Sequence, residues 1–282
     1  MKTVLTLCLT AIFSIFSYAQ SNKSKPFVLG VTDEIYSKEL KEKRTLNIYL
    51  PEGYTKTDTI HYPVVYLLDG SADEDFIHVA GLYQFSSFEW VNLVPKSIVV
   101  GIATVDRKRD FTYPTTITED KIKYPTTGHS DVFIAFLEKE LQPFVEKNYK
   151  ANTEKTIIGQ SLGGLLATEV LLKKPFLFSN YIIISPSLWW DNGSLLNQHS
   201  SLPEDTYSKK TAIYIGVGKE GLAPSKIPRV MEVDANVLAD KVKSKSKAAT
   251  VYFDYLPEDD HATISHQAIY NALHFFHDSN KK

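Results

Sequence analysis

The chain has 282 residues, of which 43% are hydrophobic and 23% charged, and its formal net charge is -2 at pH 7. Such a composition is ordinary for a folded globular chain. The near-neutral charge argues against a nucleic acid or an anionic membrane surface as partner, because both attract strongly basic proteins.

The first 19 residues have the features of a secretory signal peptide. A positive start, Met1-Lys2, precedes an apolar run over residues 4–16, and small residues stand at Ser17 and Ala19. The run is shorter than the roughly 20 residues that span a bilayer, which argues against stable membrane insertion. Cys8, the only cysteine, lies in mid-run, which disfavours a lipoprotein. We therefore expect cleavage after Ala19 and a periplasmic or secreted protein.

Cleavage would leave residues 20–282 without cysteine, and so without a disulfide, a thiol nucleophile or a thiolate metal site. This length suits one α/β domain, and no repeat or low-complexity linker divides it. Short apolar runs predict strands, and 3-and-4 spacing of apolar residues predicts helices between them. The expected strands are 44–50, 63–69, 97–103, 155–158, 181–184, 212–216 and 251–255, and the expected helices are 130–145, 162–173, 230–242 and 261–277.

Strands that alternate with helices predict a mostly parallel sheet with helices on both faces. The strand-like stretches before residue 51 have no helix between them, so we expect an antiparallel N-terminal edge. Residues 159–163 read Gly-Gln-Ser-Leu-Gly and match the pattern G-x-S-x-G between a strand and a helix. That context is typical of the nucleophile elbow of the α/β-hydrolase fold, which predicts Ser161 as a nucleophile.

A serine nucleophile needs a base and an acid, which follow it along the chain in this fold. His261 comes shortly after the last expected strand, where its imidazole can reach the elbow. Glu220 follows the strand 212–216 in a glycine-rich loop and is the expected acid. The less favoured histidines and acids are His199, His266, His274, His277, Glu232, Asp234, Asp254, Glu258, Asp259 and Asp260.

An oxyanion hole needs two N–H donors near the nucleophile. The first is expected from the backbone of Leu162, directly after the serine. The second is expected from the loop after residues 63–69, from Gly70 or Ser71.

These motifs together resemble the putative-esterase family of α/β hydrolases, which includes esterase D, feruloyl and acetyl-xylan esterases and mycolyltransferases. Periplasmic enterochelin and bacillibactin esterases are the most similar branch. The resemblance covers roughly residues 27–277 and rests on the segments 66–70, 106–110, 159–164, 185–190, 218–220 and 260–261. It implies the same triad of Ser161, Glu220 and His261.

Two groups of side chains are candidates for substrate binding. Trp189 and Trp190 follow the carboxyl end of a strand, where they could stack on a catecholate, a feruloyl ring or a sugar, or pack in the core. Arg107 and Arg109 could hold an anionic substrate, or form salt bridges with Asp106 or Asp110.

The expected activity is hydrolysis of a small-molecule or glycan-linked ester through an acyl-enzyme, with no metal and no organic cofactor. A siderophore ester is the first expected substrate, and a feruloyl or acetyl carbohydrate ester is the alternative. A non-catalytic binding protein on the same fold is a third hypothesis. The oligomeric state is left open.

Overall fold

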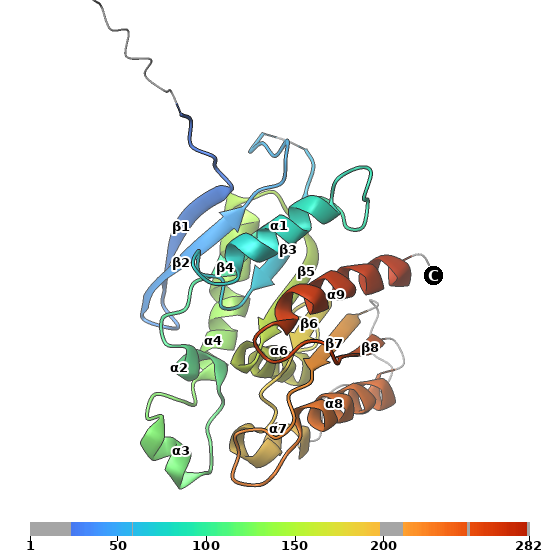
Figure 1. Cartoon of the computed structure of the whole chain (residues 1–282). Coiled ribbons are helices and arrows are strands. Elements are labelled where there is room, and N and C mark those ends of the chain that lie inside the picture. The colour runs from blue at the N-terminus through green and yellow to red at the C-terminus, as the bar shows by residue number, and fades with distance from the viewer. Residues whose placement is uncertain (1–23, 58, 198–210, 247–248, 281–282) are drawn as a thin grey trace, which may run out of the picture.

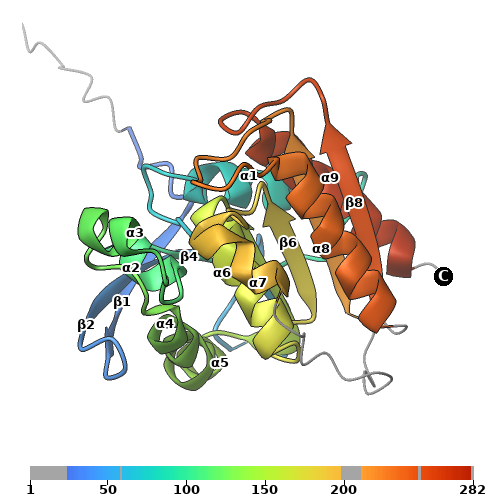
Figure 2. The same cartoon turned by 90° about the horizontal axis from the view of Figure 1, so that it is seen from below.

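The structure is a computed structural model that describes residues 24–57, 59–197, 211–246 and 249–280. The expected signal peptide and His199 lie outside these residues. The described strands form one eight-stranded sheet in the order β1-β2-β4-β3-β5-β6-β7-β8, with helices on both faces (Figures 1 and 2).

The strands confirm the expected mostly parallel sheet. Strands β3 to β8 are parallel, whereas β1 pairs antiparallel with β2, and β2 pairs antiparallel with β4. The N-terminal edge is therefore antiparallel, as predicted. The strand bounds are β1 (Gly30–Ser37), β2 (Glu42–Tyr49), β3 (Tyr62–Leu67), β4 (Ile98–Ile102), β5 (Ala151–Gln160), β6 (Asn180–Ile184), β7 (Ala212–Gly218) and β8 (Thr250–Leu256).

The helices form two layers, each with its own apolar core. Helices α1 (Phe76–Ser86) and α9 (Ile264–Asn280) cover one face. The other face is covered by α4 (Ser130–Phe136), a π-helical turn (Leu137–Leu141), α5 (Gln142–Asn148), α6 (Leu162–Lys173) and α8 (Met231–Lys245). Shorter helical segments lie in the connections, namely α2 (Arg107–Phe111), α3 (Thr118–Lys123), η2 (Trp190–Gly193) and α7 (Ser194–Asn197).

Strand β3 shows why a continuous apolar run forms a central strand. Successive side chains point to opposite faces of a sheet. Val64 and Tyr66 therefore pack in the core under α4 to α6, and Val65 and Leu67 pack in the core under α1 and α9. A strand with helices on both sides needs apolar residues at every position, which is the pattern in the sequence.

The strand order creates a crevice at the carboxyl ends of β3 and β5. Strand β3 pairs with β4 on one side and with β5 on the other, so the connections after β3 and β5 leave toward opposite faces. Ligands of open α/β sheets bind at such a switch point. None of the helices in the described residues is long and apolar enough to cross a membrane.

Candidate active site

Ser161 stands alone between strand β5 and helix α6, on a tight turn. Its backbone has φ 59° and ψ -118°, a conformation that residues other than glycine rarely adopt. Two glycines make the turn possible. A Cβ on Gly159 would lie 2.3 Å from the carbonyl oxygen of Gly163, and a Cβ on Gly164 would lie 2.8 Å from that of Ile184. The strain is characteristic of an exposed nucleophile at a strand-to-helix turn.

His261 and Glu220 meet from two neighbouring strands. Glu220 follows β7, and His261 follows β8 and lies three residues before α9 begins at Ile264. We expected His261 to open that helix, but the Asp260 carboxylate accepts from the N–H groups of Ala262 and Thr263, and the helix begins after this turn. The imidazole Nδ1 lies 2.6 Å from Glu220 Oε2.

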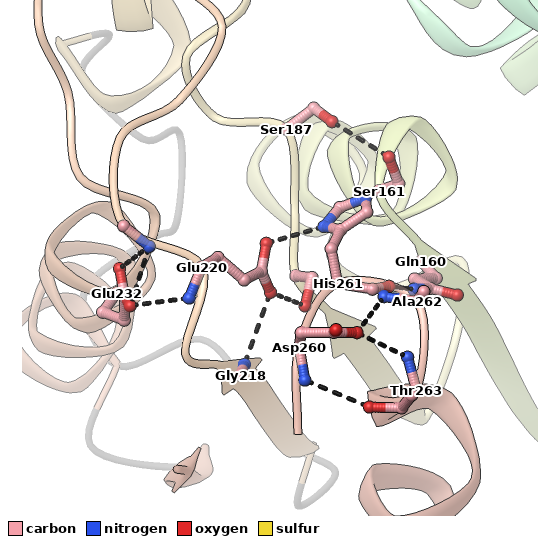
Figure 3. Close-up of polar contacts among 12 residues, drawn as sticks. Gln160, Ser161, Ser187, Gly218, Glu220, Glu232, Asp260, His261, Ala262 and Thr263 are labelled. Carbon is pink, nitrogen blue, oxygen red and sulfur yellow. Dashed lines mark hydrogen bonds and ion pairs between the residues drawn. The ribbon is translucent and has the colours of Figure 1, made fainter. Parts of the chain in front are cut away.

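The Glu220 carboxylate is fixed on its other oxygen as well. Its side chain is 3% exposed, whereas that of His261 is 47% exposed. The Ser185 hydroxyl and the Gly218 N–H donate to Oε1, the latter at 3.3 Å. Because Glu220 engages Nδ1, the imidazole presents Nε2 on its other side, and Figure 3 shows the ring lying between Glu220 and Ser161.

The hydroxyl of Ser161 points to a second serine. Its Oγ lies 3.3 Å from Oγ of Ser187, and among the described contacts no hydrogen bond joins it to His261 (Figure 3). Ser187 is buried and donates its own N–H to the Ser161 carbonyl at 3.0 Å. Catalytic hydrogen bonds often tighten only in the reactive complex.

Of the three candidate oxyanion donors, two keep their N–H groups available. Leu162 opens α6, where N–H groups have no intrahelical acceptor. Gly70 is unsuitable because its N–H already donates to the Ile102 carbonyl at 3.0 Å. The Ser71 N–H has only a long contact of 3.4 Å to Glu74 Oε2, so Ser71 is the second donor that the geometry favours.

The two arginines lie in ion pairs. Arg107 binds both carboxylate oxygens of Asp69, at 2.8 and 3.0 Å, and donates to the Gln160 carbonyl at 3.2 Å. It therefore ties the loop after β3 to the elbow. Arg109 binds both oxygens of Glu42 at 3.0 and 2.6 Å and also pairs with Asp110 at 2.8 Å. Neither arginine lines the cavity beside Ser161.

A cavity of about 490 Å³ adjoins the triad residues. Trp189, Leu222, Pro224 and Met231 give it apolar walls, and Lys219 is the cation among its lining residues. Trp190 is excluded from it, since this side chain is 2% exposed and donates its indole N–H to the Tyr113 carbonyl at 2.8 Å. The carboxylates of Glu220 and Asp260 line it as well, so the cavity offers an apolar face beside charges of both signs.

The sequence did not predict the roles of four side chains around the site, of which Glu232 was named only as a less favoured acid. Ser185 and Ser187 contact the acid and the nucleophile, and both lie in the segment 185–190, in which only the tryptophans stood out. Gln160 donates to the His261 carbonyl at 2.5 Å. Glu232, on α8, accepts from the N–H groups of Glu220 and Gly221 at 2.8 and 3.0 Å. Only the unassigned first x of G-x-S-x-G could have drawn attention to Gln160.

The chain is similar to several known proteins. The family described as "Putative esterase" matches residues 37–266. The ferri-bacillibactin esterase BesA of Bacillus subtilis is 31% identical, over 72% of this chain and 71% of its own. A solved IroE-like serine hydrolase from Shewanella oneidensis superposes with a TM-score of 0.77 at 32% identity, covering 88% of this chain and 80% of that one. The BES protein of Bacillus cereus gives a TM-score of 0.75 at 26% identity, covering 90% and 97%.

Proposed function

This chain belongs to the putative-esterase family and is a carboxylic ester hydrolase, and we propose that it acts through a triad of Ser161, His261 and Glu220. The observation that carries the proposal is the 2.6 Å contact between His261 Nδ1 and Glu220, which presents the imidazole beside a serine on a strained elbow. This arrangement can raise the reactivity of a hydroxyl that is otherwise a poor nucleophile.

The reaction would proceed in two steps through an acyl-enzyme. Ser161 Oγ attacks the ester carbonyl while its proton passes to Nε2 of His261, and Glu220 stabilises the resulting imidazolium. The N–H groups of Leu162 and Ser71 hold the oxyanion. The C–O bond to the leaving alcohol breaks as His261 returns the proton to it. Water, deprotonated by His261, then releases the acid and restores Ser161.

We propose a siderophore ester with aromatic, anionic arms as the substrate. The ferri-bacillibactin esterase of B. subtilis, which is 31% identical to this chain, supports this choice. Within the cavity, Trp189 and Leu222 offer apolar contact to a ring, and Lys219 offers a positive charge. Iron, where present, would enter as part of the substrate. The signal-like residues 1–19 support a periplasmic or secreted location for this activity.

A feruloyl or acetyl carbohydrate ester is the alternative, favoured by one observation. Trp189 is half-buried at the cavity, and an aromatic face of this kind can also stack on a sugar ring. The third hypothesis, a binding protein without activity, does not agree with the family to which the chain belongs.

The first test is hydrolysis of p-nitrophenyl butyrate by residues 20–282 and by the Ser161→Ala and His261→Ala variants. We expect each substitution to lower kcat by about 10³-fold or more, because triad members act as a unit. A fluorophosphonate probe should label the parent protein and not Ser161→Ala. Unchanged turnover in Ser161→Ala would disprove the assignment of the nucleophile.

The second test compares substrates. A ferric tris-catecholate trilactone should give a higher kcat/KM than methyl ferulate or acetylated xylan, and Lys219→Ala should lower only the value for the anionic substrate. The reverse order of substrates would favour the carbohydrate esterase.

A further inference from the structure

The base of the proposed triad lies on an exposed turn, so something must fix its distance from the nucleophile. The Lys219 N–H donates to the Asp259 carbonyl at 2.7 Å, which holds the turn on the side of Glu220. The Asp260 carboxylate holds it internally, through the N–H groups of Ala262 and Thr263. Neither contact reaches strand β5, which carries the nucleophile.

Gln160 supplies the contact from that side. This residue directly precedes Ser161, and its Nε2 donates to the His261 carbonyl at 2.5 Å. The hydroxyl of Ser265, in the first turn of α9, donates to Oε1 of the same amide. The orientation of the amide follows from the first bond, because the His261 carbonyl can only accept and the NH₂ group must therefore face it, which leaves Oε1 for the Ser265 hydroxyl.

The backbone of Gln160 is fastened as well. Its carbonyl accepts from Arg107 at 3.2 Å, and Arg107 in turn binds Asp69 in the loop that carries Ser71. Gln160 is thus in contact with the turn of His261, with α9 and, through Arg107, with the oxyanion loop. Figure 3 shows its side chain beside His261 and Ala262.

We infer that Gln160 is a positioning residue, which sets the distance between the His261 imidazole and the Ser161 hydroxyl independently of Glu220. The inference rests on the proposed function. Gln160 and Ser161 are joined by one peptide bond, so an amide that binds the His261 backbone couples base and nucleophile directly. Glu220 fixes only the opposite edge of the ring.

The test uses three variants and one control in residues 20–282. Gln160→Glu keeps the shape and the acceptor for Ser265, but it turns an oxygen toward the His261 carbonyl in place of the NH₂ donor. Gln160→Ala removes both contacts, and Ser265→Ala removes only the contact of the amide with α9. Gln267→Ala is the matched control, since it removes an exposed glutamine amide of α9 that bonds only to Asn271.

On p-nitrophenyl butyrate, Gln160→Glu and Gln160→Ala should lower kcat by about 10- to 100-fold, the loss expected from a displacement of roughly 1 Å between reacting groups. KM should change little, because Gln160 does not line the cavity. Ser265→Ala should lower kcat by less, and Gln267→Ala should not change it. Labelling of Ser161 by the fluorophosphonate probe should slow in parallel with kcat.

Two controls separate positioning from loss of fold. The low-field proton resonance of His261 Nδ1–H, which reports the bond to Glu220, should persist in Gln160→Glu, together with an unchanged unfolding midpoint. The inference is overturned if Gln160→Glu keeps kcat within about twofold of the parent. It is also overturned if the fall in kcat of this variant equals the fraction of the variant protein that is unfolded. An inactive parent protein would overturn the proposed function itself, and the inference with it.

Discussion

At the residue scale, Glu232 organises the loop that carries the proposed acid. Its carboxylate accepts from the N–H groups of Glu220 and Gly221, the latter through both oxygens at 3.0 and 3.1 Å. Burial alone would raise the pKa of Glu232, but hydrogen bonds from the backbone N–H groups of Gly221, of Glu232 itself and of Glu220 outweigh it, so the pKa lies below 4.5. The folded state therefore favours the charged form of this side chain.

We expect Glu232→Gln to lower the free energy of unfolding at pH 7 by about 1–2 kcal/mol, since hydrogen bonds to a charged group contribute roughly that much. It should also lower kcat, because the Glu220 loop loosens. A carboxylate whose pKa is lower in the folded state stabilises above pH 4.5, and this stability is lost as pH falls through the folded pKa. In urea titrations the difference in free energy of unfolding between the parent and Glu232→Gln should therefore shrink below pH 4.5. A constant difference would contradict this account.

Some residues of the site could be predicted because their roles are encoded locally. Ser161 was marked by its flanking glycines between a strand and a helix, and Glu220 and His261 by their places after successive strands of the sheet. Gln160, Ser185, Ser187 and Glu232 carry no such local signal. Their contacts depend on the packing of segments that are far apart in the chain, which no single segment specifies.

At the element scale, helices α1 and α9 share an apolar core and also a contact between two histidines. His78 Nε2 on α1 lies 2.7 Å from His266 Nδ1 on α9. A hydrogen bond between two imidazoles needs one N–H and one lone pair, so it cannot persist when both rings are protonated. Burial, followed by the charge of His266, lowers the pKa of His78 below 6.5. Acidification should therefore weaken this contact between the two helices.

A histidine whose pKa is lower in the folded state stabilises in its neutral form, so its contribution is complete above pH 6.5 and is lost as pH falls through the folded pKa. We expect the free energy of unfolding of the parent protein to fall more between pH 7.5 and 5.5 than that of His78→Gln. The exposed His61, which contacts only the Thr59 carbonyl, offers the control variant His61→Gln. Equal pH slopes in parent and His78→Gln would refute the role of the pair.

Helix α1 also shows where prediction of elements from sequence failed. No helix was expected over 76–86, although the neighbouring strands and α6 were. Its apolar residues do not form a single stripe, because Ile77 and Phe85 are exposed while Phe76 and Val79 are buried. Periodicity is informative only when apolar side chains keep to one face. The first four residues of β5, Ala151 to Glu154, were missed for a related reason, since they are not buried.

At the scale of the whole molecule, stability after cleavage of residues 1–19 would come from the sheet and its two cores alone. Residues 20–282 contain no cysteine, so no covalent cross-link limits the unfolded chain. The mostly parallel sheet with helices on both faces was predictable in outline, because continuous apolar runs specify strands covered on both faces. The pairing of β2 with β4 was not, since it joins segments separated by β3.

Reducing agents should consequently have no effect on residues 20–282. We expect the same thermal unfolding midpoint with and without dithiothreitol, in contrast to exported proteins whose disulfides contribute about 2–5 kcal/mol. Differential scanning calorimetry under the two conditions checks this. A lower midpoint in the presence of dithiothreitol would contradict this expectation, because residues 20–282 contain no bond that this reagent reduces.

The positive φ of Ser161 implies a conflict between activity and stability at one position. Backbone strain of this kind costs on the order of 1–3 kcal/mol, and glycine would relieve it at an entropic cost of about 0.5–1 kcal/mol. The inactive variant Ser161→Gly should therefore be more resistant to heat than the active enzyme. Selection for thermostability alone would then replace Ser161, although turnover depends on its hydroxyl.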